Sequence, residues 1–173
     1  RHQMVFINDT TLVVTWYSGH CLEAIPLSAL DSITTYAGEC NTGGSTFEAT
    51  RLDMRINGPV GVAYNEKDTV YSALHGGAAI IAINTNTDMG TALCSCSAGP
   101  RYLSFDPFTG DIYVTLNGGL GIIDAGNQGK NLEHYVGTGN SFGTFSNTDI
   151  QTADDLVQLD NQTWILTDNG YHR

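Results

Sequence analysis

GPVGVAYN, residues 58–65, and GPRYLSFD, residues 99–106, are two copies of one pattern that stand 41 residues apart. Both copies open with Gly-Pro and then place an apolar residue, a small residue, an aromatic residue and Asn or Asp at the same positions. After one inserted residue the match continues, because residues 70–77 (VYSALHGG) correspond to residues 112–119 (IYVTLNGG). Self-similarity at a fixed spacing is the sequence signature of repeat architectures, so the chain is predicted to be built from repeated units.

Two weaker copies flank this pair. Upstream, residues 6–13 (FINDTTLV) align without gaps on residues 64–71. Downstream, residues 156–160 (LVQLD) and residues 163–170 (TWILTDNG) repeat the first two strands of the pattern. The chain therefore carries four copies of the unit, the last of them incomplete.

Each copy is predicted to be a run of short β-strands. Runs of β-branched and aromatic residues alternate with turn-forming residues, and the Asn-Gly pairs at 117–118 and 169–170 favour tight hairpins. The expected strands of the two central copies are residues 60–64, 69–74, 79–83 and 91–94, and then residues 101–105, 111–116, 120–124 and 132–136. Only residues 28–33 have a helical pattern, and they are few. Four antiparallel strands every 40 to 45 residues are typical of a β-propeller.

The stretches between the copies are rich in Gly, Thr, Ser and Asn and are predicted to be loops: residues 39–57 and 137–152. The first of them resembles the connector of NHL repeats, through Tyr36-Ala37-Gly38, Gly43-Gly44, Phe47, Ala49 and Gly58-Pro59. Residues 135–139 (YVGTG) repeat the opening of that connector. The chain departs from the NHL pattern where His75 and Asn117 stand in place of the usual Asp. The resemblance implies a six-bladed propeller of the extracellular type, a class that includes calcium-dependent lactonases and amidating lyases.

The fold class predicted is therefore all-β, a β-propeller of four-stranded antiparallel blades with about three and a half blades in this chain. The expected blades are residues 3–40, 59–97 and 100–137, with a half blade at residues 155–173. An open arc exposes unpaired strand edges, which associate readily. We therefore expect the remainder of the propeller to come from a longer chain or from another subunit.

Alternate strand residues are expected to pack between the blades. They are apolar or aromatic: Val60, Val62, Tyr64, Tyr71, Leu103, Phe105, Tyr113, Trp16 and Trp164. Burying large apolar side chains of this kind contributes about 1.5–3 kcal/mol each, so a role in the core is expected for them before a role in binding.

Composition excludes several classes of partner. Lys and Arg number 7 against 18 Asp and Glu, a net charge of −11, which opposes binding to nucleic acid or to anionic membrane surfaces. No apolar run is long enough to span a bilayer. Four cysteines, only two lysines and two glycosylation sequons, at Asn8 and Asn161, favour a secreted or cell-surface glycoprotein.

The cysteines fall into two pairs. In the first copy the third strand begins at Cys21, the fourth strand ends near Gly38, and the hairpin between them is centred near residue 30. Cys21 therefore lies about opposite Cys40, and a disulfide there would contribute about 3 kcal/mol. Cys94 and Cys96 point to one face of a single strand. A bond between them would be strained, and partners outside this chain remain open for them.

The binding-surface candidates are His75, Asn117 and Asn169, because the repeat places all three at the turn between the second and third strands. Equivalent turns gather on one face of a propeller. The alternative is that these residues serve hairpin geometry, which requires a positive φ. The calcium candidates are Asp149, Asp154 and Asp155, in a loop that could supply oxygen ligands although it lacks Asp-x-Asp-x-Asp-Gly spacing.

No nucleophile elbow, phosphate-binding loop or dinucleotide fingerprint occurs in the chain, and no catalytic residue is assigned. The function predicted is a non-enzymatic extracellular propeller, without a cofactor, for protein–protein interaction or for assembly of a larger glycoprotein. One alternative is a metal-dependent hydrolase or lyase of the six-bladed type. A second is a carbohydrate-binding propeller that uses aromatic residues such as Tyr102 or Trp16.

Overall fold

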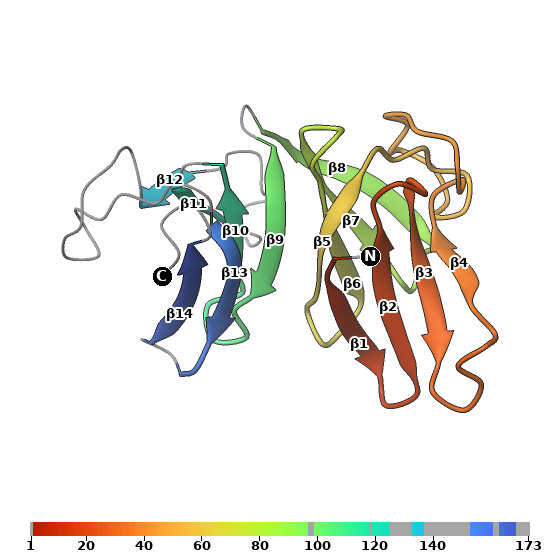
Figure 1. The fold of residues 1–173 in the computed structure, drawn as a ribbon, viewed down its shortest axis with the longest axis horizontal. Coiled ribbons are helices and arrows are strands. Elements are labelled where there is room, and N and C mark those ends of the chain that lie inside the picture. The colour runs from red at the N-terminus through yellow and green to blue at the C-terminus, as the bar shows by residue number, and fades with distance from the viewer. Residues whose placement is uncertain are drawn as a thin grey trace.

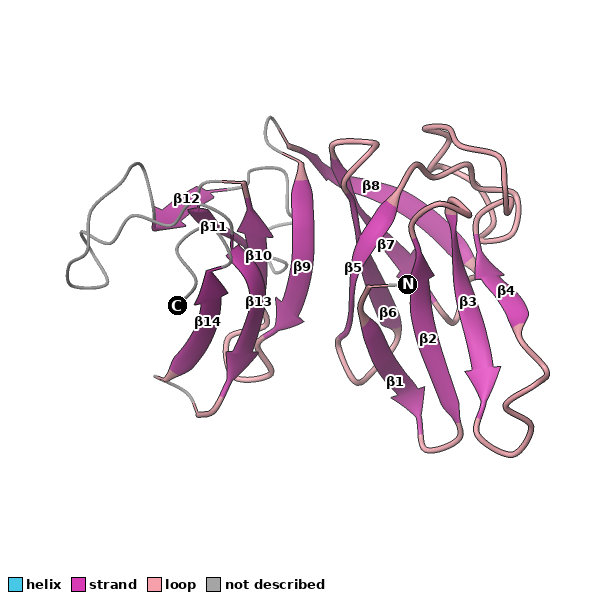
Figure 2. Ribbon diagram, in the orientation of Figure 1, coloured by secondary structure: helices cyan, strands magenta, loops and turns pink. Residues whose placement is uncertain are grey.

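The computed structural model is all-β and consists of separate antiparallel sheets set side by side (Figures 1 and 2). It describes residues 2–96, 99–117, 119–124, 133–136, 153–160 and 163–168. Within these ranges there are strands and turns and no helix. Residues 28–33, the helical candidate of the sequence, form turns instead.

Three four-stranded blades and the first two strands of a fourth follow one another along the chain. Blade 1 contains β1 (Met4–Asn8), β2 (Thr11–Trp16), β3 (Cys21–Pro26) and β4 (Thr34–Ala37). Blade 2 contains β5 (Pro59–Tyr64), β6 (Thr69–Leu74), β7 (Ala79–Asn84) and β8 (Met89–Ser95). Blade 3 contains β9 (Pro100–Phe105), β10 (Ile112–Leu116), β11 (Gly119–Ile123) and β12 (Glu133–Val136). The half blade contains β13 (Ala153–Gln158) and β14 (Trp164–Asp168).

The order of strands within every blade is sequential, and each neighbour is antiparallel. The first strand of each blade lies against the first strand of the next, so that β1, β5, β9 and β13 form the inner side of an arc. This arrangement is the blade architecture of a β-propeller, and it confirms the predicted fold class of about three and a half blades.

A single side chain joins the inner strands of the first three blades. Gln3 Oε1 accepts hydrogen bonds from the backbone N–H groups of Val62, at 2.8 Å, and Leu103, at 3.1 Å. Its amide nitrogen donates to the Leu103 carbonyl oxygen at 2.9 Å. The side chain therefore acts as a bridge from blade 1 to the inner strands of blades 2 and 3.

The repeat is also visible in how the inner strand meets its neighbour. Pairing between the first two strands shifts by one residue in blades 2, 3 and 4, which leaves backbone groups outside the ladder. Side-chain hydroxyls satisfy them. The N–H groups of Tyr102 and Asp155 donate to Thr115 and Thr167, while the Ser72 hydroxyl donates to the Gly61 carbonyl. The hydroxyls thus pair backbone groups that the shifted ladder leaves without a strand partner.

Apolar side chains fill the seams between blades in three clusters. The expected core residues Val60, Val62, Tyr71 and Leu103 are buried. The other five are half-buried: Tyr64, Phe105, Tyr113, Trp16 and Trp164. The aromatic members still pack across the seams, since Tyr71 stacks on Phe105 at 6.4 Å and Tyr113 lies 4.1 Å from Trp164 between ring centroids.

The connector between blades 1 and 2 is more than the loop predicted for residues 39–57. Met54 and Ile56 are fully buried in the seam between these blades. The Cys21–Cys40 disulfide, predicted from the hairpin centre, holds the start of the connector to β3. Arg51 donates from one guanidinium nitrogen to the Tyr36 carbonyl at 2.7 Å and pairs with Asp88 of blade 2. The disulfide thus fastens the connector to blade 1, and the side chain of Arg51 joins it to both blades.

The described part of the chain includes no helix with the length and apolar character needed to cross a membrane.

Candidate functional site

The turns after β2, β6 and β10 lie at the same end of the arc, the upper end of Figure 1, where the arrows of β2 and β10 finish. The first turn residues there are Tyr17, His75 and Asn117, and Asn169 falls outside the described residues. Tyr17, His75 and Asn117 line one pocket of about 300 Å³ together with His2, Val60 and Arg101. We call this hollow the mouth pocket. The structure thus brings two of the three predicted binding-surface residues together.

The interpretation that His75 and Asn117 are there for their backbone conformation is wrong. The described non-glycine residues with positive φ are His20, Asn41, Glu66, Ala78 and Asp88, and neither candidate is among them. A left-handed backbone conformation therefore does not account for His75 and Asn117, which both line the mouth pocket.

The Gly-Pro openings of the repeat have a packing role at this site. A Cβ added to Gly99 would lie 2.6 Å from Nδ1 of His75, and one added to Gly58 would lie 2.8 Å from a ring carbon of Tyr17. Both distances are too short for real atoms. Each glycine at the start of an inner strand thus lets the backbone pass under the ring of the preceding blade, and the ring stays in place at the pocket.

The rings of the mouth pocket form a row across blades 1 and 2. His2 meets Tyr17 edge-on at 5.7 Å, and Tyr17 lies 6.4 Å from His75 between ring centroids. Nδ1 of His75 is buried and makes no hydrogen bond. Partial burial lowers the pKa of His2, and the positive charge of Arg101 and the nearby His75 act in the same direction. His2 is therefore predominantly neutral at neutral pH, and it offers a polar ring rather than a charge.

Arg101 is the charged member of the mouth pocket. Its Nη2 lies 3.2 Å from Oδ1 of Asp154, and both side chains are about a quarter exposed. The pair joins β9 to β13 and so ties blade 3 to the half blade. Burial raises the pKa of the adjacent Tyr102, and the negative charges of Asp154 and Asp155 raise it further.

The calcium candidates are not brought together as a site. Asp149 lies outside the described residues, and Asp154 faces Arg101. Asp155 accepts the N–H of Leu156 at 2.9 Å through its own carboxylate. Over the described residues no three His, Cys, Asp or Glu side chains are grouped so that they could hold a metal ion. Calcium binding by the chain stays a prediction.

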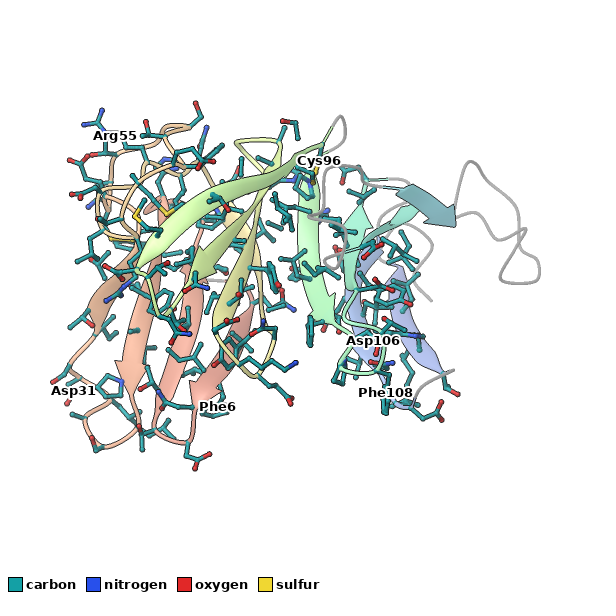
Figure 3. The ribbon with its side chains drawn as sticks, turned by 180° about the vertical axis from the view of Figure 1, so that it is seen from behind. Phe6, Asp31, Arg55, Cys96, Asp106 and Phe108 are labelled. Atoms are coloured by element: carbon teal, nitrogen blue, oxygen red, sulfur yellow. A yellow bond between two sulfur atoms is a disulfide. The ribbon has the colours of Figure 1, made fainter. Side chains whose placement is uncertain are left out.

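A second hollow of about 570 Å³ lies between β1 on one side and β9 and β13 on the other. Three of its apolar members are strongly exposed, namely Met4 at 62%, Leu159 at 59% and Phe108 at 67%. Figure 3 shows Phe108 and Asp106 at the end of the arc opposite to Cys96. This hollow therefore presents exposed apolar side chains from β1, from the turn after β9 and from the end of β13.

The predicted glycosylation site Asn8 is exposed in the β1–β2 turn. Its Oδ1 accepts hydrogen bonds from the N–H and the hydroxyl of Thr10, both at 2.9 Å. The other sequon residue, Asn161, lies outside the described residues.

Four residues of the mouth pocket were not among the predicted site residues: His2, Tyr17, Val60 and Arg101. The repeat carried a signal for Tyr17, because the end of the second strand aligns Trp16-Tyr17 with Leu74-His75. The counterpart of Arg101 in blade 2 is Val60, which also lines the pocket, but a buried apolar residue at that position gives no sign of a site.

Comparison with known proteins identifies the fold and no family. No family model matches the chain, and no curated protein matches it. One similar solved structure is the nidogen/laminin complex, with a TM-score of 0.64, 16% identity, and coverage of 88% of this chain and 50% of that one. A second is hydrazine synthase from Kuenenia stuttgartiensis, at a TM-score of 0.56 and 12% identity over 78% of this chain and 34% of that one.

A third is a putative 6-phosphogluconolactonase from Bacteroides uniformis, with a TM-score of 0.52, 15% identity, and coverage of 89% of this chain and 45% of that one. The chain spans half the length, or less, of these solved structures. At such identities the likeness establishes the β-propeller fold and nothing about activity.

Proposed function

We propose that this chain is part of a non-enzymatic extracellular β-propeller that binds another protein through the face bearing the mouth pocket. The observation that carries the proposal is the convergence of Tyr17, His75 and Asn117, from three successive blades, on one hollow with Arg101. Tyr and Arg are among the residues enriched at protein interfaces, where they dominate binding energy.

Two features of the pocket suit a protein partner. Tyr17 is 39% exposed although its ring contacts neighbouring rings. Those contacts hold the ring in a fixed position at the surface. Asn117 is exposed at the same pocket, and its side-chain amide offers both a hydrogen-bond donor and an acceptor. The nidogen/laminin structure supplies an example of a similar fold within a protein–protein complex.

The propeller proposed is larger than the described arc. Among the described strands β14 pairs only with β13, and a two-stranded hairpin is marginally stable by itself. Val157 and Ile165, both about half exposed, form an apolar face on the half blade. Further blades, from the same polypeptide or from another subunit, would cover this face and continue the sheet.

An extracellular location is supported by the Cys21–Cys40 disulfide and by the exposed sequon at Asn8. Expression in a secretory host followed by intact-mass measurement before and after deglycosylation tests it. A glycan mass that is lost in Asn8→Gln is expected, with any second glycan assigned through Asn161→Gln. Secretion without any glycan would contradict the glycoprotein part of the proposal.

Photo-crosslinking tests the binding face. A benzophenone amino acid is placed at Asn117, which is exposed at the mouth pocket, and in a control at Lys67, which is exposed in the β5–β6 turn at the opposite end of blade 2. Each protein is illuminated with a pool of extracellular proteins. The proposal expects a defined adduct from position 117 that excess unlabelled protein competes away, and none from position 67. Adducts from position 67 alone would overturn it.

The alternatives of a metal-dependent hydrolase or lyase and of a carbohydrate-binding propeller stay predictions. Stoichiometric metal with chelator-sensitive turnover of lactones would favour the first. Glycan binding that is lost in Tyr102→Ala or Trp16→Ala would favour the second.

A further inference from the structure

Cys94 and Cys96 lie together at the seam between blades 2 and 3. Cys94 is the second-last residue of β8. Cys96 directly follows the end of that strand, near the start of β9 (Figure 3). The pairing of β8 with β7 shifts by one residue between Ile80 and Ile81, so that Ile80 faces Cys94. Because residues directly opposite in a sheet share a face, this bulge turns Cys94 toward blade 3 with Ile80.

Both thiols are nearly inaccessible and close to each other. Cys94 is 6% exposed and Cys96 5%, within the apolar cluster that includes Leu103 and Ile112 of blade 3. Their sulfur atoms are 3.5 Å apart. A disulfide bond is about 2.05 Å long, so an approach of about 1.5 Å joins them.

The backbone at the end of β8 allows the two sulfur atoms to approach each other. Residues two apart in an extended strand have Cα atoms about 6.6 Å apart, near the upper limit of about 6.8 Å for a disulfide. A small contraction at Ser95 is therefore required. Ser95 is the last residue of β8. After it, the backbone of Cys96 is held by a hydrogen bond from its N–H to the Ala78 carbonyl at 2.7 Å.

We propose that Cys94 and Cys96 form a second, reversible disulfide in blade 2, made and broken by exchange with small thiols and disulfides when local opening of the seam with blade 3 exposes the sulfurs. The Cys94 thiolate attacks a disulfide RSSR, giving a mixed disulfide and RS⁻, which takes up the proton that Cys94 lost. The Cys96 thiolate then attacks the sulfur of Cys94, and the second RS⁻ leaves with the Cys96 proton. Two thiols are oxidised, and one RSSR is reduced to two RSH.

The order of attack follows from the contact between the two sulfurs. The hydrogen bond from the Cys96 thiol lowers the pKa of Cys94, while the same contact and burial raise the pKa of Cys96. Cys94 is thus the thiol that ionises first and attacks the incoming disulfide. Cys96 is the resolving thiol.

This disulfide is expected to be easier to reduce than the Cys21–Cys40 disulfide. Cys21–Cys40 closes a loop across 19 residues of sequence and fastens the blade connector, and closing such a loop gains stability by constraining the unfolded chain. A bond between neighbours two residues apart gains almost none, and it opposes the extended backbone of β8. A dithiol reductant should therefore open it first.

Peptide mapping of the unmodified protein provides the test, since trypsin separates the two pairs. Cleavage after Arg1, Arg51, Lys67 and Arg101 leaves Cys21 and Cys40 in residues 2–51 and Cys94 and Cys96 in residues 68–101. The protein, produced in an oxidising compartment, is denatured with an alkylating agent, digested and weighed. The peptide of residues 68–101 is expected to be unalkylated and lighter than the dithiol form by two hydrogen atoms.

A titration with dithiothreitol before alkylation measures the second part of the proposal. Residues 68–101 should gain two alkyl groups at about a tenfold lower reductant concentration than residues 2–51, a difference of about 30 mV. Cys94→Ser serves as a control, because it leaves Cys96 to be alkylated without reduction or recovered as a mixed disulfide. Full alkylation of both cysteines in the unreduced wild-type protein, or a link from either one to another molecule, would overturn the proposal.

Discussion

The bridge made by Gln3 is the feature of the arc that a single substitution tests most sharply. Its side chain makes three hydrogen bonds to the backbone of Val62 and Leu103, in two other blades. We predict that Gln3→Met, which keeps the size of the side chain and removes all three bonds, destabilises the protein by about 2–4 kcal/mol.

The magnitude follows from the surroundings of the bridged groups. A hydrogen bond inside a protein contributes about 1 kcal/mol net, and a buried N–H left without a partner costs about 1–3 kcal/mol. Val62 and Leu103 are 1% and 2% exposed, so water does not readily replace the lost oxygen. Gln3 itself is half-buried, so water can partly reach the site. The expected loss of unfolding free energy therefore lies in the lower part of the sum of these contributions.

Two measurements check this prediction. Thermal unfolding should show a midpoint lower by about 10 °C, given about 2–4 °C per kcal/mol for a chain of this size. Hydrogen exchange by NMR should show faster exchange of the Val62 and Leu103 amides. Gln3→Glu keeps the oxygen that accepts from Val62 and Leu103 but replaces the donor with a second oxygen facing the Leu103 carbonyl, so it should destabilise the protein as well. A Gln3→Met protein within about 0.5 kcal/mol of wild type would refute the bridge.

Three further predictions follow from the packing. Gly61→Ala should lower the unfolding midpoint strongly or prevent folding, because the new Cβ meets the backbone of β9, with Leu103 N at 3.0 Å. The control Gly110→Ala, in open space at φ +85°, should cost only about 1 kcal/mol. An equal effect of the two substitutions would contradict the close approach of β5 and β9. Burial raises the pKa of Tyr36 to about 12, against the opposing effect of Arg51, so ultraviolet titration should find a late-ionising tyrosine that is absent in Tyr36→Phe. Since the unfolded state ionises first, the stability from this neutral side chain is complete below about pH 10 and is lost as the pH rises toward 12; a Tyr36 that titrates with the exposed tyrosines would refute its burial. Replacing both Cys21 and Cys40 by Ser should cost about 3 kcal/mol in unfolding free energy, and no change under denaturant would show that the disulfide contributes nothing to stability.

The strands could be predicted because each blade is determined by nearby residues. Residues 69–74 were expected to be a strand and are β6 at the same bounds. Asn65, in the turn before it, accepts three backbone N–H groups through one oxygen, which is the behaviour that makes Asn a turn residue. The disulfide was also predictable, since a hairpin places residues equidistant from its centre opposite each other.

Contacts between distant residues were not predictable from the pattern. Gln3 meets Leu103 across 100 residues, and nothing in a polar side chain before a strand indicates such a partner. The burial of Met54 and Ile56 was hidden within a stretch whose composition is that of a loop. The approach of Cys94 and Cys96 depends on a bulge, a one-residue shift that the alternation of residues does not encode.

The candidate site was predicted in part for the same reason. The repeat placed His75 and Asn117 at equivalent turns, and equivalent turns of neighbouring blades do meet at one pocket. Arg101 was not predicted at the pocket. It pairs with Asp154 of the half blade, and a contact between two blades depends on how they pack.

The most direct test of the proposed binding face is the affinity of the crosslinked partner for matched variants of the isolated protein. Tyr17→Ala and Asn117→Ala, at the mouth pocket, are each expected to raise the dissociation constant about tenfold or more, a loss of about 1.4 kcal/mol. Lys67→Ala, exposed at the opposite end of blade 2, should change it less than about twofold. Loss of affinity in Lys67→Ala with full affinity in both mouth variants would contradict the account.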